Sequence, residues 1–76
     1  MFNIGDKLKV KQSAVESEYA EWKGSQVYDA MVKNAEEKRF EIVGMDGANY
    51  VIRRLEDNAE LPYNKQMAHT NFEVVT

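Results

Sequence analysis

The amino-acid sequence predicts a small α+β domain, mainly β, built from about five short antiparallel strands with a helical insertion after the first strand. Apolar and charged residues alternate over Lys7–Lys11 and again over Phe72–Val75, as they do in strands with one buried face. Two β-rich runs within Arg39–Arg54 flank the turn signal Asp46-Gly47 and predict a hairpin. Between the first strand and this hairpin, about residues 13–37 carry helix-favouring side chains at helical spacing.

The composition limits the size of the core and the kinds of site. The 76 residues are predicted to form a single domain, and a chain this short buries only about 60% of its unfolded surface. The sequence contains no cysteine, so neither disulfides nor thiolate metal sites are expected. The start of the chain, Met1–Lys7, has the features of neither a signal peptide nor a membrane span. We therefore expect a cytoplasmic protein with no membrane contact.

The net charge of −3 is unevenly distributed along the chain. Residues 13–37 contain six acidic and two basic side chains, a balance of −4, whereas the remaining residues have a balance of +1. This asymmetry predicts a distinct element with a solvated acidic face. Because nucleic-acid-binding domains are usually strongly basic, general affinity for nucleic acid is disfavoured.

The first strand is predicted to bury Leu8 and Val10 and to expose three lysines, Lys7, Lys9 and Lys11. The lysine row permits two interpretations. It could form a basic stripe that binds nucleic acid, or it could keep the outer face of the strand in solution and discourage edge-to-edge pairing. We favour the second interpretation.

The insertion is predicted to contain one or two helices. Ser13-Ala14-Val15-Glu16 fits a capping box at the start of a helix over about residues 14–23, and Gly24 is a natural terminator. Ser25 could cap a second helix that reaches about residue 37, or the glycine and serine could mark a kink in one longer helix. An isolated helix of this length is marginal, so its apolar side is expected to dock on an open face or end of the sheet.

The register of the hairpin is predicted from its two faces. A three-residue loop, Met45–Gly47, with its glycine in the left-handed conformation, pairs Ile42 with Tyr50 and Phe40 with Ile52. These four side chains then share one dry face, as a half-exposed antiparallel sheet requires. On the opposite, wet face, Glu41 is expected to lie close to Arg53.

The remaining segments are predicted to complete the sheet. Leu61-Pro62-Tyr63 is expected to be a short edge strand, since proline suits an edge position. Asn64 to Asn71 is expected to be an irregular or 3₁₀ turn, and Phe72–Val75 a closing strand. The predicted core is supplied by Leu8, Val10, Phe40, Ile42, Tyr50, Ile52, Phe72 and Val74.

In the order of its elements the chain resembles small SH3-like barrels, the architecture shared by Tudor, KOW and many uncharacterised bacterial and phage domains. Ile4–Val10, Phe40–Ile52 and Asn71–Val75 carry the resemblance, which leaves out residues 13–37. It implies an antiparallel barrel of about five short strands with one or two helices inserted between strands 1 and 2, and often a binding role. No set of functional residues can be transferred from such barrels to this chain.

The chain lacks the usual groups of an enzyme. His69 is the only histidine, no cysteine can partner it, and a single histidine in a turn is more often a surface or capping residue. Asp46-Gly47 lacks the further carboxylates of a cation loop, and Glu36-Glu37 and Glu56-Asp57 are neighbours that do not share a helix face. We expect no catalytic residue, no cofactor and no metal.

The aromatic residues are the candidates for a binding site. Tryptophan and tyrosine are enriched at interface hot spots, but in a thin domain they also seal helix to sheet. The leading hypothesis is a small non-catalytic adaptor domain that contacts another protein through Tyr19, Trp22, Tyr28 and Tyr63. A nucleic-acid-binding module that uses the lysine row, and a homo-oligomeric structural protein, are the alternatives.

Overall fold

A computed structural model describes residues 1–75 as an α+β domain. Its elements are β1 (Lys7–Val10), α1 (Gln12–Glu18), the 3₁₀ helix η1 (Ala20–Trp22), α2 (Gln26–Glu37), β2 (Phe40–Asp46), β3 (Asn49–Arg54), β4 (Glu60–Asn64), α3 (Lys65–Asn71) and β5 (Phe72–Val74). The prediction of an α+β domain with five antiparallel strands is confirmed. Helices occupy 39% of the described residues and strands 33%, so the fold is less dominated by strands than the sequence indicated.

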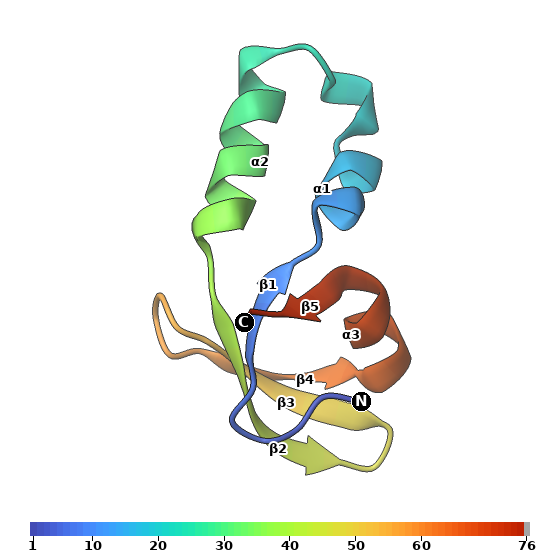
Figure 1. Cartoon of the computed structure of the whole chain (residues 1–76), viewed down its shortest axis with the longest axis vertical. Coiled ribbons are helices and arrows are strands. Elements are labelled where there is room, and N and C mark those ends of the chain that lie inside the picture. The colour runs from blue at the N-terminus through green and yellow to red at the C-terminus, as the bar shows by residue number, and fades with distance from the viewer. Residues whose placement is uncertain (76) are drawn as a thin grey trace.

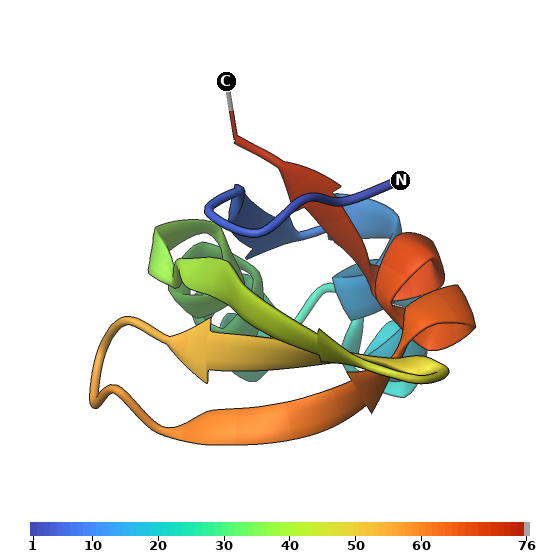
Figure 2. The same ribbon diagram turned by 90° about the horizontal axis from the view of Figure 1, so that it is seen from below.

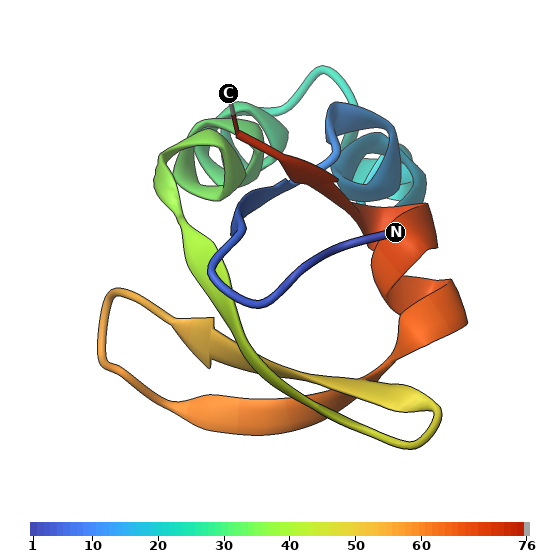
Figure 3. The same cartoon turned by 60° about the horizontal axis from the view of Figure 1, so that its bottom comes forward.

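The five strands form one sheet in the order β4-β3-β2-β1-β5. Every neighbouring pair is antiparallel. Within residues 1–75, β4 and β5 are the two edges and do not pair with each other, so the sheet is not closed. Figure 3 shows the strands curling around the N-terminal segment, with α3 along one side.

The helical insertion projects from one end of this sheet. Figure 1 shows α1, η1 and α2 as a helical hairpin above the strands, and the domain extends 39 Å along this direction against 23 and 22 Å across it. Seen from below, the hairpin lies behind the sheet rather than over either face of it (Figure 2). The helices therefore lengthen the domain, and most of their surface is left uncovered by strands.

The start of α1 differs from the prediction, whereas the start of α2 confirms it. Lys11 is the N-cap of α1 and makes no side-chain cap hydrogen bond, and Ser13 lies inside the first turn, so the predicted capping box is wrong. At α2, the Ser25 hydroxyl accepts the N–H of Tyr28 at 3.1 Å, as a capping serine should. Gly24, at a φ of +90°, separates η1 from α2. The insertion is thus two α-helices rather than one kinked helix, and the first ends at Glu18, with η1 in place of the last turn that was predicted to reach about residue 23.

The predicted register of the β2–β3 hairpin is wrong, but the predicted dry face is right. Asp46 pairs with Asn49 across a two-residue loop, and a bulge at Val43 then shifts the register so that Ile42 pairs with Ile52. With the two-residue loop alone, the side chains of β2 beyond the turn would face the wrong side of the sheet. The extra residue in β2, Val43, turns Ile42 back toward the core. The side chains of Ile42, Tyr50 and Ile52 are all buried.

The core contains most of the residues that were predicted for it. Leu8, Ile42, Tyr50, Ile52 and Phe72 are buried, and Val10 and Phe40 pack partly against them. The prediction for Val74 is wrong, because this residue ends the edge strand β5 and is 41% exposed. The core also includes Phe2 and Ala68, which were not predicted.

The segment before β5 is a helix rather than an irregular turn. The side chain of Asn64 accepts the N–H of Met67 at 3.1 Å and caps α3. The buried Ala68 of this helix packs into the core. The prediction of a 3₁₀ turn is wrong because the cap at Asn64 starts a full α-helical segment immediately after β4.

Residues 1–6 cross the concave side of the sheet and are fixed there by Phe2 (Figure 3). Gly5 N–H donates to Ile42 O at 2.8 Å, and Ile42 N–H donates to Asp6 O at 3.0 Å. The N-terminal segment therefore pairs with β2 over a short distance and brings the Phe2 ring onto the core. No helix within residues 1–75 is long and apolar enough to cross a membrane.

Candidate protein-binding surface

The helical hairpin is held together by a narrow apolar seam. Val15 of α1 is buried, and it is the only buried side chain between residues 12 and 37. Tyr28, Val32 and Ala35 of α2 are half-buried and recur at the spacing of one helix face. This face of α2 is therefore the one that packs against α1, and it uses little of the apolar surface of the helix.

A second set of apolar side chains on the hairpin is exposed. Val27 and Met31 lie one turn apart on α2 and are 45% and 37% exposed. Trp22 of η1, near the tip of the hairpin, is 51% exposed. We call these three residues the exposed apolar set. Val27 and Met31 are neighbours on α2, and adjacent exposed apolar side chains mark interaction surfaces more often than scattered ones do.

Three of the four predicted site residues lie on the hairpin. Trp22 N–H donates to Tyr19 O at 2.9 Å, which fixes η1, and Tyr28 lies in the first turn of α2. Tyr19 and Tyr28 are half-buried, so Trp22 is the aromatic residue that is most open to a partner.

Tyr63 does not join the other predicted residues. It lies on β4, where its ring meets Phe72 edge to face at 5.3 Å and its hydroxyl accepts Asn71 Nδ2–H at 2.9 Å. Figure 1 shows β4 in the sheet, at the end of the domain opposite η1. Tyr63 therefore belongs to the wall of the core rather than to the hairpin surface.

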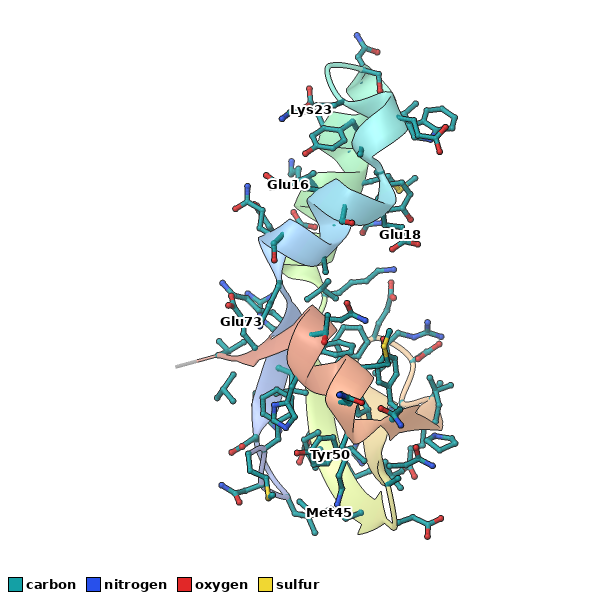
Figure 4. All side chains as sticks on the ribbon, turned by 90° about the vertical axis from the view of Figure 1, so that its right-hand side faces the viewer. Glu16, Glu18, Lys23, Met45, Tyr50 and Glu73 are labelled. Carbon is teal, nitrogen blue, oxygen red and sulfur yellow. The ribbon has the colours of Figure 1, made fainter. Side chains whose placement is uncertain are left out.

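The carboxylates of the hairpin are exposed and form no ion pair within residues 1–75. Figure 4 shows Glu16 and Glu18 projecting from opposite sides of α1, with Lys23 near the hairpin tip. We call the full set the hairpin carboxylates: Glu16, Glu18, Glu21, Asp29, Glu36 and Glu37. Their charge is left to be compensated by solvent ions or by another molecule.

Five charged side chains of the sheet, by contrast, are paired with one another, whereas Asp46 and Glu60 form no ion pair within residues 1–75. Glu41 lies 2.7 Å from Lys7 Nζ and 2.9 Å from Arg53 Nη2, which confirms the predicted proximity of Glu41 and Arg53. The hydrogen bond from Lys7 lowers the pKa of the Glu41 carboxyl most, and the one from Arg53 lowers it further. Lys9 pairs with Glu73 at 3.4 Å.

Lys11 and Arg39 are also engaged within the chain. Lys11 Nζ donates to His69 O at 3.0 Å, and Arg39 donates to the backbone carbonyls of Glu36 and Lys38. A phosphate group would have to displace these contacts. Lys7 and Lys9 therefore form ion pairs within the sheet, and Lys11 contacts α3. The prediction that the row protects an edge strand is wrong, because β1 lies between β2 and β5.

A cleft and an apolar pocket adjoin the sheet. A cleft of about 370 Å³ lies between the base of the hairpin and the sheet, and its polar lining includes Lys9 and Glu73, which pair with each other. An apolar pocket of about 120 Å³ lies between the edges β4 and β5, lined chiefly by Phe40, Leu61 and Phe72. In the part of the chain that the structure describes, no group of three or more acidic or histidine side chains is placed to hold a metal ion.

Sequence reasoning missed Val27 and Met31 as surface residues, because every apolar position of the second helix was expected to dock. The spacing of the apolar residues along the second helix already indicated two rows. Val27 and Met31 form one apolar row, and Tyr28, Val32 and Ala35 form the next. In the structure the seven-residue α1 leaves the first row exposed, and the second row is half-buried.

The chain matches no family model, no curated protein and no solved structure in the three comparisons made.

Proposed function

We propose that this chain is a small non-catalytic adaptor domain that contacts another protein through its helical hairpin. The strands would serve as the scaffold and the hairpin as the contact element. The fold we propose for the scaffold is a small SH3-like barrel that is open between β4 and β5. Its support is the strand order, in which β1 lies between β2 and β5, and the short helix α3 that connects β4 to β5.

The exposure of Trp22 carries the proposal. A tryptophan side chain gains more than most from burial, yet this one, at the end of η1, is 51% exposed. Val27 and Met31 add exposed hydrocarbon on the same hairpin. Tryptophan is enriched at interface hot spots.

Site-specific photo-crosslinking tests the proposal. We would replace Trp22 with p-benzoylphenylalanine in the full chain, irradiate cells of the source organism, and identify adducts by mass spectrometry. A matched control carries the same probe at Met45, which is 41% exposed but lies on the β2–β3 hairpin. We expect one or a few defined protein adducts from position 22 and none from position 45.

The outcome that contradicts the proposal is equally specific. The adduct should disappear when V27S and M31S are added to the position-22 probe, because a true contact surface includes these neighbours. Adducts from position 45 alone, or adducts that survive both serine substitutions, would place the contact elsewhere. Adducts between two copies of the chain would instead support the homo-oligomeric alternative.

A further inference from the structure

We infer that the surface this domain recognises is cationic and apolar: a segment of another protein that presents lysine or arginine beside aliphatic or aromatic side chains. The inference rests on the proposed function, because it assigns a chemistry to the partner of the same hairpin. Two independent properties of the hairpin carry it, namely its exposed hydrocarbon and its uncompensated charge.

The exposed apolar set supplies the contact area. Val27 and Met31 share one face of α2, next to the face that packs on α1. Methionine is flexible and polarisable, so it adapts to partners of varied shape. A partner must therefore bring apolar side chains of its own to remove Trp22, Val27 and Met31 from water.

The net negative charge of the hairpin favours a partner with a positively charged surface. The four ion pairs within residues 1–75 all lie outside the hairpin, at Lys7–Glu41, Lys9–Glu73, Arg53–Glu41 and Arg54–Asp57. The hairpin carboxylates have no such partners, and residues 13–37 carry a net charge of −4. Negative charge on the hairpin that carries the exposed apolar set steers association with cationic partners and disfavours anionic ones.

The same charge argues against the other occupants of this surface. Nucleic acids and anionic lipid headgroups are polyanions, which an acidic hairpin repels. A second copy of this chain that docked hairpin to hairpin would bring like charges together. A cationic segment of a different protein meets neither obstacle.

Fluorescence titration of the full chain tests the inference, because Trp22 is the only tryptophan and sits within the surface. The probes are three designed, tryptophan-free amphipathic peptides with the same leucine pattern and with lysine, glutamine or glutamate on the polar face. We expect a saturable blue shift of the Trp22 emission with the lysine peptide. Its affinity should fall by about tenfold or more between low and high salt, since exposed charges are screened. The glutamate peptide should not bind.

Three variants test the charge and the apolar contacts of the hairpin separately. E16Q/E18Q/E21Q should weaken binding of the lysine peptide by about tenfold, because complementary charge is removed while the apolar set is kept. V27S/M31S should abolish the blue shift while all hairpin carboxylates remain. M45S removes an exposed methionine from the sheet and should change neither result.

Each contrary result has a distinct meaning. If the glutamine peptide binds as tightly as the lysine peptide, the charge assignment is overturned while the hairpin stays a docking surface. Binding of the lysine peptide that survives V27S/M31S is charge attraction alone, and it overturns the inference. A lysine peptide that fails to bind at low salt also overturns it. The photo-crosslinking experiment at position 22 uses no peptide, so it tests the proposed function independently of this inference.

Discussion

Nε2 of His69 lies 2.8 Å from the buried hydroxyl of Tyr50, and this contact joins α3 to the centre of the sheet. The same hydroxyl oxygen accepts the N–H of Phe2 at 3.3 Å. The Phe2 ring stacks on His69 with 4.3 Å between ring centroids. The single histidine thus has a structural role, as the bridge between a buried tyrosine and the N-terminal segment.

Loss of the Tyr50 hydroxyl should weaken the fold measurably. Tyr50→Phe removes the partner of both Phe2 N–H and His69 Nε2, so we expect a loss of about 1–2 kcal/mol in the free energy of unfolding. Urea denaturation measures it. Tyr63→Phe is the matched control, because its half-buried hydroxyl has one partner, Asn71, and should cost less. Equal losses for the two variants would contradict the bridging role.

The packing of the N-terminal segment on the core, and with it the stability of the fold, should depend on the side chain of Phe2. Phe2→Ala leaves a cavity beside Tyr50 and His69, and such truncations cost about 3–5 kcal/mol in a well-packed core. Ile4→Ala, at a residue that is 64% exposed, should stay within about 0.5 kcal/mol of the parent. Thermal and urea unfolding of both variants would measure the difference. Similar stabilities would show that Phe2 is not a core residue.

The glycine in the β2–β3 turn is needed for its backbone conformation. Gly47 has a φ of +59°, where alanine is disfavoured, so Gly47→Ala should destabilise the fold by about 1 kcal/mol. A methyl group at this position would meet no atom within 4 Å, so the cost is conformational rather than steric. Gly44→Ala is the control, since its φ is ordinary and the nearest neighbour of an added methyl, Val51 Cβ, is at 3.6 Å. A Gly47→Ala variant as stable as Gly44→Ala would contradict this account.

The Arg54–Asp57 pair should give the stability a dependence on acid pH. Two hydrogen bonds from Arg54, and then one from the N–H of Ala59, lower the pKa of Asp57 from 3.8 to about 2. A carboxyl whose pKa is lower in the folded chain stabilises the fold above its unfolded pKa, and this contribution is lost as the pH falls through the folded pKa. Stability should therefore decrease between about pH 4 and pH 2.

Asp57→Asn tests that assignment, because it removes the titrating group while it keeps a similar shape. Urea midpoints measured across the acid range should fall less steeply for this variant than for the parent. Some dependence should remain, because the pKa of Glu41 is also lowered, by Lys7 and Arg53. An unchanged slope would contradict the role of the Arg54–Asp57 pair.

Local patterns predicted the strands and the inner face of the sheet well. Alternation placed Leu8 and Phe72 inside, and the mixed runs of β2 and β3 placed Ile42, Tyr50 and Ile52 together. The register could not be predicted in the same way. The turn and the bulge at Val43 compensate each other, so several registers satisfy the same burial pattern.

Other features depend on contacts between distant segments, which a local pattern does not contain. Phe2 lies between the apolar residues Met1 and Ile4, which are exposed, and only its contacts in the fold, such as the stacking on His69, distinguish it from them as core. Val74 alternates correctly, but its place at the end of an edge strand leaves it exposed. On the hairpin, the periodicity of α2 indicated the helix and did not say which apolar row would meet α1.

Acrylamide quenching of Trp22 fluorescence tests the central claim most directly, because the single tryptophan reports only the hairpin surface. In the free, folded chain we expect a red-shifted emission that is quenched nearly as readily as in urea, and strong protection when the crosslinked partner is added. Blue-shifted emission that resists quenching in the free chain would show that Trp22 is packed within the fold, and would contradict the claim that the hairpin is a docking surface.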